Sequence, residues 1–308
     1  MCQLLCDIDV IDFLYNSEED KDSGESFESE GDDLFLCRLQ NDAYQSRTGY
    51  RITLPDDFLG LYKEEISSGT ASICISSGEV DRDNFKITIE ENAELTLVSN
   101  RRRKLNSNYE LTIGTRSVLA VQLTTSFVES GTRRSEDPGL STTEIEGTIF
   151  GTGPDAPEHD VLSQYSACSH GALNLVPATG PNIVNGVAEV RLGRRIAGEE
   201  ILGSLQDFIL EATENVVGSV DQYSHVVFCI PDDALMDGST KWTAFTYFHS
   251  HWSFFQKRRC SAMSVTMHEL GHNIGVSRCY LLLNFLFGFC GLNISSQDLA
   301  PLFSICCL

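Results

Sequence analysis

The pattern His268-Glu269-Leu270-Gly271-His272 constrains this chain more than any other feature of its sequence. Residues four apart lie on one face of an α-helix, so a helix here would direct both imidazoles at one point. Glu269 lies one residue, about 100° of helical rotation, from His268, and can reach a water molecule held at that point. We therefore expect a metal-binding helix with His268 and His272 as ligands and Glu269 as the catalytic base. The alternative is a core helix with two buried histidines and no metal.

Two imidazoles beside a carboxylate are the ligand and base set of zinc peptidases, so the expected cofactor is Zn²⁺. A catalytic zinc ion usually has a third protein ligand, but Arg278 stands three residues after Gly275 and no His follows His272. Three explanations stay open. The chain from about Val276 is a truncated or misread continuation, or Asp298 is the third ligand, or the protein keeps the fold without the chemistry.

The net charge and the composition limit the classes of partner that we expect. The 308 residues carry a formal net charge of −22, which argues against a nucleic-acid partner. The Ser, Gly and acid run through Asp33 predicts an acidic flexible segment over 1–33. Residues 276–308 form an atypical apolar, Cys-rich tail. Its apolar stretch over 279–294 is shorter than the about 20 residues of a membrane span, so we expect no membrane association; a membrane-tethered protein is the alternative.

The cysteines and the N-terminus bear on the compartment. The chain has 11 Cys, and a disulfide among Cys168, Cys229 and Cys260 is expected if the protein is exported, with the pairing left open. The N-terminus lacks a basic region followed by a long apolar core, so no signal peptide is evident.

Short alternating apolar runs predict a β-rich, propeptide-like domain over 34–112. The run Arg101-Arg102-Arg103-Lys104 that follows is either an exposed basic patch or the site at which a propeptide is removed. A thiolate of Cys37 or Cys74 that occupies the zinc in a latent form is a further hypothesis.

Residues 113–275 predict a second domain in which strands alternate with helices. The run 242–248 is interpreted as an exposed edge strand that can hold an extended substrate by strand addition, or as an ordinary edge strand. His249 and His251 belong either to a solvated loop or to a second metal site. The predicted strands are 117–123, 187–192 and 225–230, with short helices or turns at 142–150 and 158–167, a helix of about five turns at 199–217 and the metal helix at 261–274.

This order predicts an α/β (α+β) fold with a twisted mixed sheet above the metal helix, preceded by the small β-rich domain. The His-Glu-x-x-His-x-x-Gly pattern resembles that of the metzincin peptidases, and 113–275 resembles their upper subdomain, with the tail 276–308 in place of the lower one. Residues 116–275 are also similar to the gametolysin (autolysin) peptidases. The matching segments are 164–171, 185–187, 225–231 and 264–267.

The resemblance implies a secreted zinc metalloendopeptidase, made as a zymogen, that cleaves protein or glycoprotein of the extracellular matrix or cell wall. The chain departs from the metzincin pattern at Arg278, and no Met follows Met267 to form that family's Met-turn. The alternative function is therefore a catalytically inactive, peptidase-like interaction protein that lacks the third zinc ligand.

Overall fold

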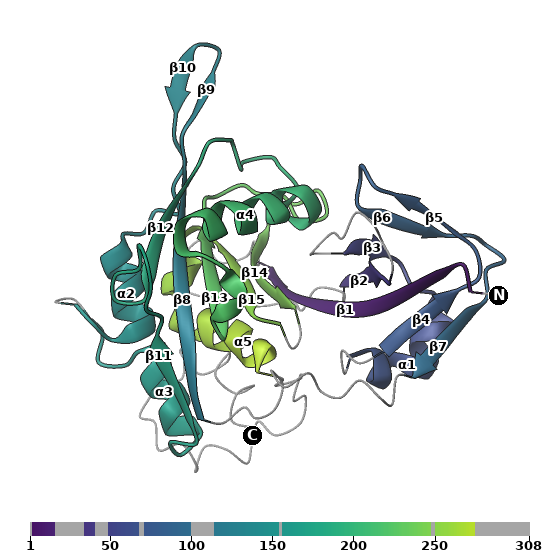
Figure 1. Ribbon diagram of the computed structural model, residues 1–308, viewed down its shortest axis with the longest axis horizontal. Helices are drawn as coiled ribbons and strands as arrows, with labels where there is room; N and C mark the ends of the chain where they lie inside the picture. The colour runs from purple at the N-terminus through teal and green to yellow at the C-terminus, as the bar shows by residue number, and fades with distance from the viewer. Residues whose placement is uncertain are drawn as a thin grey trace, which may run out of the picture.

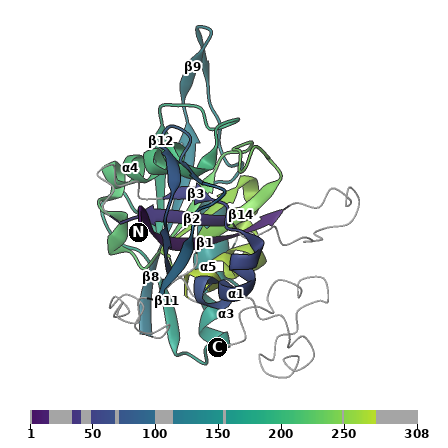
Figure 2. The same ribbon diagram turned by 90° about the vertical axis from the view of Figure 1, so that its right-hand side faces the viewer.

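The structure is a computed structural model that describes residues 2–15, 34–40, 49–67, 71–99, 114–153, 156–247 and 250–274. It has a mixed α/β fold. Within these ranges, thirteen strands join in one continuous sheet, and helices pack against its faces (Figures 1 and 2).

The strands that follow residue 113 form the mixed half of this sheet. At its centre lies β8 (Gly114–Thr125), a near-continuous apolar strand buried on both faces, as predicted for 117–123. Its parallel neighbours are β11 (Leu173–Pro177) and β12 (Val187–Leu192) along one edge and β13 (His225–Ile230) along the other. Next come β15 (Trp252–Gln256), parallel to β13, and β14 (Trp242–Tyr247), antiparallel to β15.

Alternation along β8 divides the core between the two sheet faces. Leu119 and Val121 pack against α4 (Gln206–Val217) on one face. Val118 and Ala120 point to the other face, which α2 (Thr142–Phe150), α3 (Val161–Cys168) and α5 (Met263–Asn273) cover. The helix α5, which carries the predicted zinc ligands, thus lies under the sheet, where the sequence places it. A small hairpin of β9 (Phe127–Glu129) and β10 (Thr132–Arg134) projects away from this body (Figure 1).

The segment before residue 100 is β-rich, as expected. Its strands are β2 (Leu34–Leu39), β3 (Tyr50–Ile52), β4 (Ala71–Ile75), β5 (Gly78–Asp81), β6 (Lys86–Ile89) and β7 (Leu95–Ser99). They pair antiparallel except for β3 with β6, which are parallel. The helix α1 (Asp56–Ser67) was not predicted. Its apolar side contributes Phe58 and Ile66 to the core of this segment.

The prediction of a flexible segment over 1–33 is wrong for β1 (Leu4–Tyr15). Ile8 and Val10 alternate with aspartates and are buried, the period of a half-buried strand that the acidic composition concealed. β1 pairs with β2 and β4 of the N-terminal segment and with β14 of the other half, so it joins the two halves of the sheet. Residues 16–33 lie outside the described ranges.

The prediction that 242–248 is an exposed edge strand is also wrong. All six residues of β14 are buried, and the strand runs between β15 and β1. Strand addition by a substrate at this edge therefore requires that β1 leave it.

The helix predicted over 199–217 begins later than expected, at Gln206. Residues Ile201–Leu205 form a π-type turn in which Leu202 is extended and Gly203 has a φ of 84°, a conformation that breaks the helical path. The predicted strands 187–192 and 225–230 and the short helices near 142–150 and 158–167 are confirmed. No helix in the described ranges is long and apolar enough to cross a membrane, and 279–294 lies outside them.

Candidate metal centre

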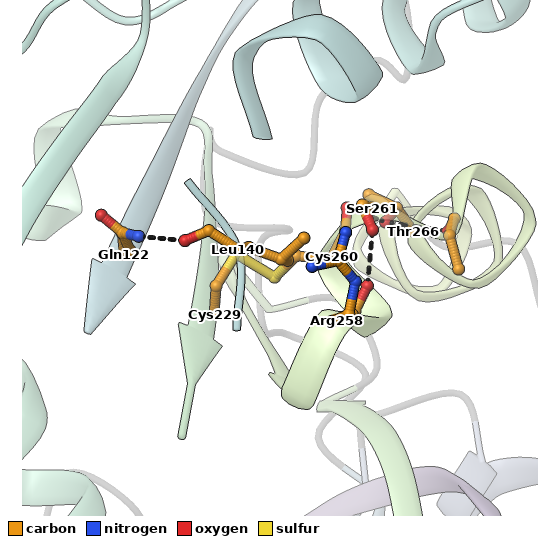
Figure 3. The surroundings of a disulfide bond; sticks show 8 residues. Gln122, Leu140, Cys229, Arg258, Cys260, Ser261 and Thr266 are labelled. Carbon is orange, nitrogen blue, oxygen red and sulfur yellow. Dashed lines mark hydrogen bonds between the residues drawn. A yellow bond between two sulfur atoms is a disulfide. The ribbon is translucent and has the colours of Figure 1, made fainter. Parts of the chain in front are cut away.

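The start of α5 is fastened to the sheet by a disulfide. The chain leaves β15, makes the 3₁₀ turn η3 (Lys257–Ser261) and returns beneath the sheet as α5. Cys260 of η3 is bonded to Cys229 of β13, with a Cα–Cα distance of 5.7 Å (Figure 3). Thr266 in the first turns of α5 donates from Oγ1 to the carbonyl of Cys260 at 3.2 Å. This pairing selects one of the alternatives that the sequence leaves open, and it leaves Cys168 outside the disulfide.

His268 and His272 meet on one face of α5, as their spacing predicts. Their Nε2 atoms are 3.0 Å apart, and the ring centroids are 4.6 Å apart with the planes nearly perpendicular. Two imidazole nitrogens bound to one tetrahedral zinc lie about 3.3 Å apart, because each Zn–N bond is about 2.0–2.1 Å. The separation also suits an N–H···N hydrogen bond between the rings, which a metal ion would replace. The donor pair therefore fits zinc with a shift of roughly 0.3 Å.

Glu269 lies between the two histidines in sequence and is fully buried. A buried carboxylate is costly unless positive charge or hydrogen-bond donors face it, and a divalent cation beside it would lower that cost. The carboxylate and the imidazole pair are thus compatible with one metal site.

Tyr165 of α3 holds the middle of the metal helix. Its Oη donates to the carbonyl of Met267 at 2.6 Å, and the ring is buried. Burial raises the pKa of Tyr165 well above its usual value, and Coulombic interactions with Cys168 and Glu269 raise it further. The phenol therefore stays protonated and keeps donating to the helix. Sequence reasoning missed this residue because its partner lies 102 positions away.

Asp298, the candidate for the third ligand, lies outside the described residues, as do Gly275 and Arg278, which stands at the third-ligand position of the metzincin pattern. Within the described ranges no group of three or more His, Cys, Asp or Glu side chains is arranged to hold a metal ion. The hypothesis of a latent Cys37 or Cys74 thiolate is wrong, since Cys37 is bonded to Cys6 and Cys74 to Cys2.

The second histidine pair is only partly described. His251 places Nδ1 3.0 Å from the carbonyl oxygen of Ser224, while His249 lies outside the described residues. A histidine that sequence reasoning did not single out lies beside it. His225 is buried at the start of β13, and burial, with the positive charges of His251 and Arg116, lowers its pKa to about 3.

Asn273, the last residue of α5, is a second polar side chain that the sequence reasoning did not single out. It is 6% exposed and contacts both β14 and β15. Its position four residues after Glu269 was the available signal, because that spacing places it on the buried face of the helix. No family model matches the chain, and no curated protein or solved structure matches it.

Proposed function

We propose that this chain is a zinc-dependent metalloendopeptidase of metzincin type, with His268 and His272 as zinc ligands and Glu269 as the catalytic base. The observation that carries the proposal is the convergence of the two Nε2 atoms, 3.0 Å apart, on the helix that also bears the buried Glu269. The mixed sheet above that helix, with one antiparallel strand beside it, agrees with the resemblance to a metzincin upper subdomain.

Zinc supplies Lewis-acid chemistry when bound, and it lowers the pKa of a coordinated water to about 7. Glu269 would accept the proton of the attacking water and return it to the amine that leaves when the peptide bond breaks. His268 and His272 must be unprotonated at Nε2 to act as ligands. Tyr165 keeps the helix backbone between them in place through its bond to the Met267 carbonyl.

Protein or glycoprotein of an extracellular matrix or cell wall is the proposed substrate. The disulfides Cys2–Cys74, Cys6–Cys37 and Cys229–Cys260 support an oxidising compartment. In the structure β14 already pairs antiparallel with an extended segment, β1. This supports the view that β14 can also pair with an extended substrate. The proposed zymogen therefore has β1 where the substrate would lie.

Zinc titration of the purified full chain tests the proposal. We expect one zinc per chain, lost in His268→Ala and in His272→Ala. In Glu269→Gln we expect zinc to be retained. After a cut near 101–104 that releases the N-terminal segment, hydrolysis of an unfolded protein substrate should be about 10²–10⁴-fold slower in this variant than in the unaltered chain, the usual contribution of a general base. Full zinc content in both histidine variants, or loss of zinc in Glu269→Gln, would show that the roles are misassigned. Asp298→Ala tests the one acidic candidate for the third ligand.

A catalytically inactive interaction protein is the second candidate function. The observation that favours it is that two imidazoles, and no third metal ligand, are grouped within the described part of the chain. It predicts a folded protein that binds zinc weakly or not at all and that cleaves no protein substrate, before or after a cut near 101–104.

A further inference from the structure

Asn273 ties the end of the metal helix to two strands at once. Its Oδ1 accepts a hydrogen bond from Ser253 Oγ of β15 at 2.8 Å. Its Nδ2 donates to Thr246 Oγ1 of β14, and it lies 3.4 Å from the carbonyl oxygens of Tyr247 and Trp252. One amide therefore satisfies groups on both strands, and its oxygen and nitrogen are assigned by their partners.

The strand residues that meet Asn273 are opposite each other in the sheet. Thr246 and Ser253 are register partners in the β14–β15 pair, and both are fully buried. Ser253 Oγ lies 3.3 Å from Thr246 Oγ1, and Thr246 Oγ1 donates to the Trp252 carbonyl at 2.8 Å. Together with the Asn273 contacts, they form a polar network inside an apolar layer. A fully satisfied network of this kind holds its members in one arrangement.

The network sets the register of α5 against the sheet. A helix advances about 1.5 Å and turns about 100° per residue, so a slip of one residue would break each Asn273 bond. His272 is the preceding residue, and Glu269 lies one turn earlier on the same side as Asn273. A polar network in a core contributes little net stability compared with apolar packing, so its effect is mainly to fix one arrangement.

We infer that Asn273 is a positioning residue for the metal centre, which fixes where His268, His272 and Glu269 stand relative to β14. The inference rests on the proposed function. It assigns the network a role beyond stability: the two imidazoles are held at the separation and rotation that a single zinc ion needs. Loss of the network should therefore weaken metal binding more than the loss of an equally buried hydroxyl elsewhere.

The test compares Asn273→Ala and Thr246→Val with two controls in the full chain. Thr246→Ser keeps the hydroxyl that Asn273 contacts. Thr213→Val removes a fully buried hydroxyl that donates to Ile209 within α4, on the opposite face of the sheet. The measurements are the zinc dissociation constant by chelator competition, the visible absorption of the Co²⁺-loaded protein, and the melting temperature.

We expect Asn273→Ala and Thr246→Val to weaken zinc binding by about tenfold or more and to alter the Co²⁺ spectrum, as changes around metal ligands do. Thr246→Ser should leave the zinc affinity and the Co²⁺ spectrum as they are in the unaltered chain. Thr213→Val should lower only the melting temperature. If Asn273→Ala and Thr246→Val are less stable but bind zinc and Co²⁺ as the unaltered chain does, the inference is overturned and the network is structural. If the unaltered chain binds neither metal, the proposed function fails, and the inference with it.

Discussion

His225 is enclosed at the first position of β13, and its Nδ1 has no hydrogen-bond partner among the described residues. Its pKa of about 3 lies far below the value near 6.5 that it has in an unfolded chain. Between these two values the unfolded state binds more protons than the folded state. The free energy of unfolding therefore falls as the pH falls through this window, by up to about 1.4 kcal/mol per pH unit.

We predict that His225→Gln flattens the dependence of stability on pH between pH 6.5 and 4. Glutamine fills most of the space and does not titrate, so the contribution of this group disappears even if stability at pH 7 is lower. Urea denaturation at several pH values measures it, with His251→Gln as the control on the neighbouring histidine. An unchanged slope in His225→Gln would assign the acid sensitivity to the carboxylates.

The residues of the candidate site differ in how close in the sequence their interaction partners lie. His268, Glu269 and His272 could be predicted because a helix imposes their relation within five positions. Tyr165 and Asn273 could not, since their roles depend on partners that only the folded sheet brings near: Met267 for one, and Thr246 with Ser253 for the other.

Among the elements, the 3₁₀ turn η3 connects the sheet to α5, the helix of the candidate metal centre. The Cys229–Cys260 disulfide closes a loop with a sequence separation of 31 residues. Such a cross-link restricts the unfolded chain and typically stabilises the fold by about 2–5 kcal/mol. The disulfide also places the start of α5 beneath β13. Its loss should therefore destabilise the first turns of that helix more than the rest of the fold.

We predict that Cys229→Ala with Cys260→Ala lowers the free energy of unfolding by about 2–5 kcal/mol. Amide hydrogen exchange should increase from Ser261 to Thr266 more than in α4. Cys168→Ala, which removes a cysteine of α3 that is not part of a disulfide, is the control and should stay within about 1 kcal/mol. Equal exchange in α4 and α5 would mean that the disulfide stabilises the whole fold without a local effect on the metal helix.

Most elements of the mixed half were predictable because each apolar run has the period of its own structure, as β8, β12 and β13 do. The errors arose where the neighbours of an element decide its environment. The alternation of β14 indicated a strand, but its burial depends on β1, which is more than 200 positions away and carries aspartates. The late start of α4 depends on one residue, Gly203, at positive φ.

At the scale of the whole molecule, β1 is the main connection between the two halves. It is tied to the N-terminal segment by Cys2–Cys74 and Cys6–Cys37, and none of the disulfides among the described residues crosses from one half to the other. Among the described residues, the contacts that cross include the backbone pairing of β1 with β14, an ion pair of Arg51 with Asp237, and apolar side chains.

Those apolar contacts are substantial. Ile11 of β1 and Leu36 of β2 are buried in the same cluster as Trp242 and Phe245 of β14. Burial of a large aliphatic side chain contributes about 1.5–3 kcal/mol. The N-terminal segment should therefore stay attached after the chain is cut, and its departure should uncover the edge of β14 that the proposed substrate requires.

We predict that a chain cut at Arg101–Lys104 elutes as one particle in native buffer and separates into two pieces in denaturing, non-reducing electrophoresis. Ile11→Ala should weaken the association of the cut pieces by about 2–5 kcal/mol, because it leaves a cavity against β14. The half-exposed Val98 of β7 supplies the control Val98→Ala, with an expected change below about 0.5 kcal/mol. Denaturant-dependent size-exclusion chromatography measures both.

Pieces that stay joined without reductant would reveal a disulfide between the halves, and pieces that separate in native buffer would show that β1 does not hold them. Where peptidase activity rises in step with release of the N-terminal piece, β1 is the segment that keeps substrate from β14.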